Sequence, residues 1–164
     1  MSQYKTNSTN SKNFNLTFEN QSIGALIYKK WYSFNAEISI VEGKTYQLEP
    51  VGFWNSKIEL KDGEKKLLEF KMSWKGIIIK TFFENEQKSY LLKLKGLLSN
   101  KFILIDTDNK ELLAAETDFK WNKLNMDYNI ETTNELENLP NKELLLLTIL
   151  HCINYYMTII VSVG

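Results

Sequence analysis

The sequence predicts a mainly β fold: a closed antiparallel barrel of about 12 strands in three repeats, enclosing a hydrophobic C-terminal helix. Three observations lead to this expectation. Apolar and polar residues alternate in short segments from Phe14 to about Glu131, a Trp-marked pattern recurs, and the stretch from Leu144 to Val163 carries no formal charge. The chain has 164 residues, which is enough for one domain, 13–164, with a sizeable core.

The strand prediction rests on a period of two. In the segment "LEFKMSW", Leu68, Phe70 and Met72 fall on one face, and Glu69 and Lys71 fall on the other. This alternation is typical of a sheet with one buried and one solvated face. The same pattern appears in "FNLTFE", "AEISI", "KIELK", "YLLKLK" and "MDYNIE". Residues 1–12 lack it and are strongly polar, so we expect them to form a disordered tail.

A repeat of about four strands is marked by tryptophan. Trp31, Trp74 and Trp121 each follow a Lys-containing strand pattern and are 43 and 47 residues apart. These residues could line a ligand pocket, but we expect them to be core anchors of the repeat. Three such units make a meander that can close on itself and so remove its edge strands.

A barrel of this size needs an internal plug. Eight strands are just filled by their own side chains, and the diameter grows with strand number. An α-helix with its side chains is about 10–12 Å across and fits the remaining space. The C-terminal segment supplies this helix, over about 141–161, with Asn141 as its N-cap. A short helix over about 133–138 precedes it, marked by the capping-box pattern Thr132-x-x-Glu135.

The C-terminal helix is also long enough to span a bilayer, so a membrane anchor is the alternative to a plug. A polar stripe favours the plug, because polar groups inside a membrane are costly. The stripe consists of Thr148, His151, Asn154, Tyr155, Thr158 and Ser162. Neither end of the helix carries the basic cluster that is typical of an anchor.

Composition excludes several functions. The 20 basic residues are all Lys and are balanced by 20 acidic residues, so we expect no nucleic-acid partner. The single cysteine, Cys152, excludes an intramolecular disulfide and a cysteine zinc cluster. The segment "DTDNKE" starts like a calcium loop but lacks its Gly and final Glu, so we expect a polar hairpin turn there, no metal and no cofactor. The polar start has no signal-peptide pattern, which favours the cytoplasm.

Twelve antiparallel strands around a hydrophobic C-terminal helix is a plan that resembles the tubby C-terminal-like superfamily, which includes tubby proteins, phospholipid scramblases and LURP-one-related proteins. The segments "GFWNSKIEL", "FKMSWKG", "DFKWNKLNMDYNIET" and "LLLLTILHCINYYM" carry the resemblance, and they look like a bacterial branch of that group. The resemblance implies lipid binding, since tubby proteins bind phosphoinositides through basic residues of the barrel. This chain lacks the Arg of that site and the Cys-rich segment of scramblases.

Two groups of residues are candidate sites. His151, Asn154 and Tyr155 form a candidate ligand-binding group on the C-terminal helix; His151 is alternatively a core histidine bonded to a strand carbonyl or a water. Lys29, Lys30, Lys71 and Lys75 fall near equivalent places in two repeats and are candidates for lipid headgroups; they are alternatively a solvated face.

The sequence therefore predicts a non-catalytic binding or scaffold module, cytoplasmic or peripheral at the membrane, whose partner is an anionic phospholipid headgroup or a protein. Two alternatives remain open. The first is a tail-anchored membrane protein with a cytoplasmic β domain. The second is an enzyme with a pocket at the barrel mouth near His151; no nucleophile with a base appears in the sequence, so no catalytic residue is predicted.

Overall fold

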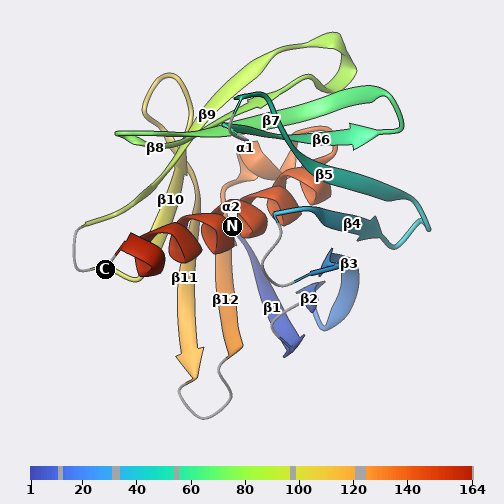
Figure 1. Cartoon of the computed structure of the whole chain (residues 1–164). Helices are drawn as coiled ribbons and strands as arrows, with labels where there is room; N and C mark the ends of the chain where they lie inside the picture. Colours follow the sequence, from blue (N-terminus) through green and yellow to red (C-terminus); the bar gives the residue numbers. More distant parts are fainter. Residues whose placement is uncertain (11–12, 31–33, 54–55, 97–98, 121–124, 164) are drawn as a thin grey trace.

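The computed structural model describes residues 1–10, 13–30, 34–53, 56–96, 99–120 and 125–163. Strands alternate with short connections, and two helices end the chain (Figure 1). The strands are β1 (Ser2–Asn10), β2 (Asn13–Phe18), β3 (Gln21–Tyr28), β4 (Ala36–Ile40), β5 (Thr45–Val51), β6 (Lys57–Asp62), β7 (Lys65–Ser73), β8 (Gly76–Thr81), β9 (Lys88–Leu94), β10 (Lys101–Ile105), β11 (Glu111–Lys120) and β12 (Asn125–Thr132). A 3-10 turn, η2 (Phe83–Asn85), and the helices α1 (Asn134–Glu137) and α2 (Lys142–Val163) complete the fold.

The strands form one closed antiparallel barrel in which every strand pairs with its neighbours in sequence, and β1 pairs with β12 to close the ring. Tyr4 of β1 lies opposite Ile130 of β12 and also opposite Phe18 of β2. Closure satisfies the backbone groups of both terminal strands, which would otherwise form exposed edges. The predicted fold class is confirmed.

The period of two separates the two faces of the barrel wall. Leu16, Leu26, Ile38 and Leu60 point inward and are fully buried. The outward positions of β5, β6 and β7 carry ion pairs between neighbouring strands, such as Lys57 with Glu69 and Lys61 with Glu49. The full set is Glu49, Lys57, Glu59, Lys61, Lys66 and Glu69.

Helix α2 fills the barrel. Its first three turns, from Leu144 to Ile153, are buried in the same hydrophobic core as the inward residues of the strands. It approaches β3 so closely that a Cβ atom on Gly24 would lie 2.8 Å from Cδ1 of Leu147. Figure 1 shows α2 surrounded by the strands. The predicted plug is confirmed: the C-terminal helix is the core of the barrel.

The alternative to a plug is a helix that spans a membrane. Among the described residues, no helix combines the length and the apolar character needed to cross a membrane.

The predicted tail over residues 1–12 is wrong for residues 2–10, and residues 11 and 12 lie outside the described part of the chain. Ser2–Asn10 form strand β1, although their composition is polar, because pairing with β12 and β2 satisfies the backbone on both sides. Tyr4 and Thr6 supply the buried inward side chains, with 2% and 1% exposure. Because only Tyr4 and Thr6 mark the inward face of β1, the sequence there does not show the alternation of apolar and polar residues that predicts a strand.

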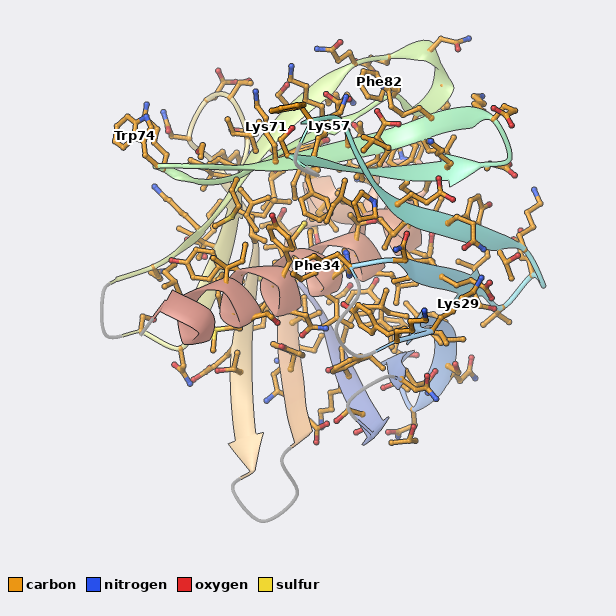
Figure 2. The ribbon with its side chains drawn as sticks, viewed as in Figure 1. Lys29, Phe34, Lys57, Lys71, Trp74 and Phe82 are labelled. Atoms are coloured by element: carbon orange, nitrogen blue, oxygen red, sulfur yellow. The ribbon has the colours of Figure 1, made fainter. Side chains whose placement is uncertain are left out.

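The expectation that the repeat tryptophans are core anchors is wrong for Trp74, which is 91% exposed. It lies in the two-residue connection between β7 and β8, beyond the end of the alternating strand, so its side chain extends from the hairpin tip (Figure 2). Trp31 and Trp121 lie outside the described residues. The predicted number of about 12 strands is confirmed, but eleven of them lie in the segment predicted to hold the repeats, and β1 precedes it.

The two helices agree with the predicted ranges to within a few residues. The N-cap of α1 is Thr133, one residue after the predicted Thr132, and its side chain accepts a hydrogen bond from the Leu136 amide. Segment Asp106–Lys110 connects β10 to β11 as a polar turn, in which Asp106 accepts hydrogen bonds from the amides of Asp108 and Lys110.

Candidate functional site

The barrel has two chemically different ends. Antiparallel strands alternate in direction, so successive connections lie at alternate ends of the barrel. The connections β1–β2, β3–β4, β5–β6, β7–β8, β9–β10 and β11–β12 lie at one end, here called the mouth. The intervening connections and α1 lie at the opposite end, here called the α1 end. In Figure 1 the β7–β8 hairpin and the end of α2 lie on the left, and the β4–β5 and β6–β7 connections lie on the right.

The sequences of the connections differ sharply between the two ends. The described residues of the mouth connections include no Asp or Glu, and the described Trp74 belongs to them. Their described basic residues are Lys29, Lys30, Lys75 and Lys95. The connections β2–β3, β4–β5, β6–β7, β8–β9 and β10–β11 at the other end hold no tryptophan. Their charged residues are Glu19, Glu42, Lys44, Glu64, Glu84, Glu86, Asp106, Asp108 and Lys110. The described connections therefore differ in charge between the two ends of the barrel, although the net charge of the chain is zero.

Six exposed residues define what we call the mouth surface: Lys29, Lys30, Phe53, Lys71, Trp74 and Lys75. Phe53 is 82% exposed, and the ammonium of Lys75 lies 4.9 Å from the centroid of the Trp74 ring. Lys71 is near the end of β7, two residues before the hairpin. Figure 2 shows Lys29 beside β3, on a different side of the barrel from Lys71 and Trp74.

All four lysines predicted as headgroup contacts thus lie at or next to the mouth. They do not form one compact cluster, because they come from two separate hairpins. The exposed aromatic residues Phe53 and Trp74 were missed as partners of these lysines. The signal that identifies them is positional: in the sequence, every second connection contains a Lys or a Trp, which becomes visible once the strands are assigned.

Beneath the mouth, His151 belongs to a buried chain of hydrogen bonds. The hydroxyl of Tyr128 donates to Oδ1 of Asn154 at 2.7 Å, and Nδ2 of Asn154 donates to the hydroxyl of Tyr28 at 3.2 Å. The hydroxyl oxygen of Tyr28 lies 2.6 Å from Nδ1 of His151. Where the Tyr28 hydroxyl donates its proton to Nδ1, His151 carries its own proton on Nε2.

Burial keeps this group neutral. His151 is fully buried, and desolvation lowers its pKa to about 3, against a smaller opposite effect of the Phe34 backbone. Nε2 has no well-formed hydrogen bond among the described residues. Burial also raises the pKa of Tyr28 and of Tyr128 well above the ordinary tyrosine value. Cys152, the neighbour of His151, is buried, which raises the pKa of its thiol.

The other predicted residues of α2 connect the helix to the wall and to the mouth. The ring of Tyr155 packs edge-on against Phe34 of the β3–β4 connection, with a centroid distance of 4.6 Å, and against Phe70 at 5.8 Å. His151 and Asn154 bind Tyr28, the last residue of β3. The three candidate ligand residues therefore contact the strand and connection that flank Lys29 and Lys30.

The α1 end is closed by a polar cluster around Glu137. Its carboxylate accepts hydrogen bonds from the Tyr4 hydroxyl at 2.9 and 3.0 Å, from Thr132, and from the Lys142 ammonium at 2.7 Å. These partners come from β1, β12 and α2. A shallow hollow near this end is lined by Thr81, Phe83, Glu86, Lys88, Tyr90, Leu139, Pro140 and Leu145. None of its lining residues is His151, Asn154 or Tyr155, so it is not the pocket expected near His151.

Comparison of the chain with protein-family models, with curated proteins and with solved structures finds no match. Within the described ranges no group of three His, Cys, Asp or Glu side chains is placed to hold a metal ion. The candidate site therefore rests on the geometry and charge of the mouth itself.

Proposed function

We propose that this protein is a non-catalytic module that binds anionic bilayers end-on through the mouth surface. The proposal rests on the contrast between the two ends of the barrel. The described connections at the mouth carry lysines and exposed aromatic rings and no acidic residue, whereas the connections at the α1 end are mainly acidic. An anionic surface attracts the first end and repels the second, so the field of the molecule orients it.

The residue types at the mouth suit the bilayer interface. Tryptophan is enriched at the level of the headgroups, where its amphipathic ring has both an apolar and a polar environment. Each lysine near an anionic membrane surface contributes about 1 kcal/mol of attraction. Trp74 and Lys75 are adjacent on one hairpin tip, so one approach of the barrel brings both to the interface.

The resemblance to the tubby C-terminal-like superfamily supports the same proposal, and we propose membership of that group. The closed barrel around a central helix is its plan. The anchor alternative is less favoured, because α2 forms part of the core of the barrel and its removal to a bilayer would leave that core empty. The enzyme alternative has no support from His151, whose imidazole is fully buried.

Vesicle co-sedimentation tests the proposal. The full chain is expected to sediment with vesicles of phosphatidylcholine and phosphatidylserine and to remain in the supernatant with phosphatidylcholine alone. Replacing Lys29, Lys71 and Lys75 by Gln lowers the partition coefficient by about five-fold per lysine, which corresponds to about 1 kcal/mol each. Trp74→Ala lowers it by about ten-fold, because burial of an aromatic ring contributes about 1.5–3 kcal/mol.

The matched control changes the same charge at the other end. Lys44, Lys65 and Lys110 are exposed near the α1 end, and their triple replacement by Gln leaves the partition coefficient unchanged if the mouth is the contact. Equal losses in both triple variants would show a non-directional charge effect and contradict the proposal. Binding to a single-stranded oligonucleotide or to a protein in place of the vesicles would also contradict it.

A further inference from the structure

The mouth surface has the charge of an anion-binding face but not the geometry of a headgroup pocket. Its described basic side chains are all lysines, since the chain has no Arg. An arginine guanidinium grips phosphate through two parallel hydrogen bonds and so reads its geometry. A lysine ammonium is a hydrated point charge on a flexible stem, which responds to nearby negative charge and much less to its arrangement.

The lysines also do not converge. Lys29 and Lys30 belong to the β3–β4 connection, and Lys71 and Lys75 belong to the β7–β8 hairpin. Figure 2 shows Lys29 and Lys71 on different sides of the barrel. A site that selects one small ligand is normally a concavity with a few convergent polar groups. A hollow among the described residues lies near the α1 end, beside Leu139 and Pro140.

The aromatic residues add affinity without adding selectivity. Trp74 is 91% exposed, so its ring is accessible to the interfacial region that all glycerophospholipids share. Lys75 lies over the Trp74 ring, which places a positive charge next to the inserting group.

We infer that the mouth surface recognises the negative charge density of a bilayer and not the identity of its headgroup. This inference rests on the proposed function and names its ligand class: any anionic glycerophospholipid, presented as a surface. A monomeric headgroup in solution then binds poorly, because it offers one lysine contact at a time and no apolar interface for Trp74.

The test compares headgroups at matched surface charge. Full-length protein is titrated with phosphatidylcholine vesicles that contain phosphatidylserine, phosphatidylglycerol or phosphatidylinositol bisphosphate, each at the mole fraction that gives the same zeta potential. We expect equal partition coefficients for the three, a steep fall with added salt, and no competition by soluble inositol phosphate. A preference of about ten-fold or more for one headgroup at matched charge overturns the inference.

A conservative variant separates charge from hydrogen-bond geometry. Lys29→Arg, Lys71→Arg and Lys75→Arg together keep the charge, so the partition coefficient stays close to that of the natural protein. The corresponding Gln variant loses most of it. If the Arg variant binds as weakly as the Gln variant, the lysines act by a specific geometry and the inference is overturned. If the natural protein binds none of the anionic vesicles, the proposed function is rejected. If it binds them but prefers one headgroup, only the present inference is rejected.

Discussion

The hydroxyl oxygen of Tyr28 and Nδ1 of His151 are 2.6 Å apart, although 123 positions separate the two residues in the chain. This contact joins the last residue of β3 to the middle of α2. It therefore ties the plug to the barrel wall, directly before the connection that carries Lys29 and Lys30. The helix not only fills the barrel but also fixes one side of its mouth.

The first prediction concerns pH. The pKa of His151 is about 3 in the folded protein and 6.5 is its ordinary value, so unfolding takes up a proton between these limits. Stability therefore falls as the pH falls below about 6.5, with a slope approaching 1.4 kcal/mol per pH unit. Urea unfolding between about pH 6 and 5 measures this slope. His151→Gln cannot titrate and gives a nearly flat profile there; a variant with the same slope as the natural protein would contradict the assignment.

Carboxylates do not obscure this window. The pKa values of Glu59, Glu69 and Glu137 are lowered, because their lysine partners outweigh the effect of burial. Their contribution to stability is present above their ordinary pKa of 4.5 and is lost only as the pH falls through lower values. Near pH 6 the slope is therefore due mainly to His151, and the carboxylates add to it as the pH approaches 5.

The second prediction concerns Tyr28→Phe. Removal of this hydroxyl leaves Nδ1 of His151 and Nδ2 of Asn154 without the partner that they share, inside the barrel. An unsatisfied buried polar group costs about 1–3 kcal/mol, so the free energy of unfolding falls by about that amount. Tyr46→Phe is the control, since Tyr46 is also a buried tyrosine of the wall but does not belong to this chain of hydrogen bonds. Similar losses of unfolding free energy in both variants would show that the Tyr28 hydroxyl contributes no more to stability than the Tyr46 hydroxyl.

The third prediction concerns the cluster at the α1 end. Glu137→Ala removes the acceptor that Tyr4, Thr132 and Lys142 share, and leaves the Tyr4 hydroxyl and the Lys142 ammonium in a partly buried place. We expect a loss of about 1–3 kcal/mol in chemical denaturation. Glu135→Ala in the same helix removes only an exposed pair with Lys110, which contributes about 0–1 kcal/mol. The order of the two losses is the result to check, and its reversal would refute the role given to Glu137.

The fourth prediction tests how closely α2 packs on β3. A Cβ atom on Gly24 would meet Cδ1 of Leu147 and the carbonyl oxygen of Ser39, both at 2.8 Å. Leu147 can move, but the strand backbone cannot, so Gly24→Ala destabilises the protein by about 1–3 kcal/mol. Gly96→Ala is the control, because its Cβ would lie 3.9 Å from the nearest side chain. Thermal unfolding distinguishes them, and equal melting temperatures would contradict the close packing of Leu147 and Ser39 around Gly24.

The barrel and its plug could be predicted from the sequence because both follow from local patterns. Alternation of apolar and polar residues in segments such as Leu68–Ser73 predicts a strand wherever the segment lies in the fold. The uncharged stretch from Leu144 to Val163 predicts a helix that needs an apolar environment. Strand β1 was missed because its pairing with β12 depends on residues more than a hundred positions away. Its own side chains give almost no sign of it.

The site could be predicted less well. The four candidate lysines do lie at or next to the mouth, but the sequence predicts a core position for Trp74 because an apolar ring is usually buried. Trp74 is exposed because it falls one residue beyond the strand, at the hairpin tip, a boundary that alternation alone does not locate. The partner of His151 could not be predicted at all: a strand carbonyl or a water was expected, and the Tyr28 hydroxyl is brought there by barrel closure.

The most direct test of end-on binding compares the two ends of one strand. Ser56 precedes β6 at the mouth, and Glu64 follows β6 at the α1 end; both are exposed, and the natural Cys152 is buried and so does not react with a label. An environment-sensitive fluorophore is attached to Ser56→Cys or to Glu64→Cys, and its emission is measured with anionic vesicles that contain brominated lipid. The account predicts a blue shift and quenching at position 56 and neither at position 64. A shift at position 64, or none at position 56 while the protein is bound, would contradict it.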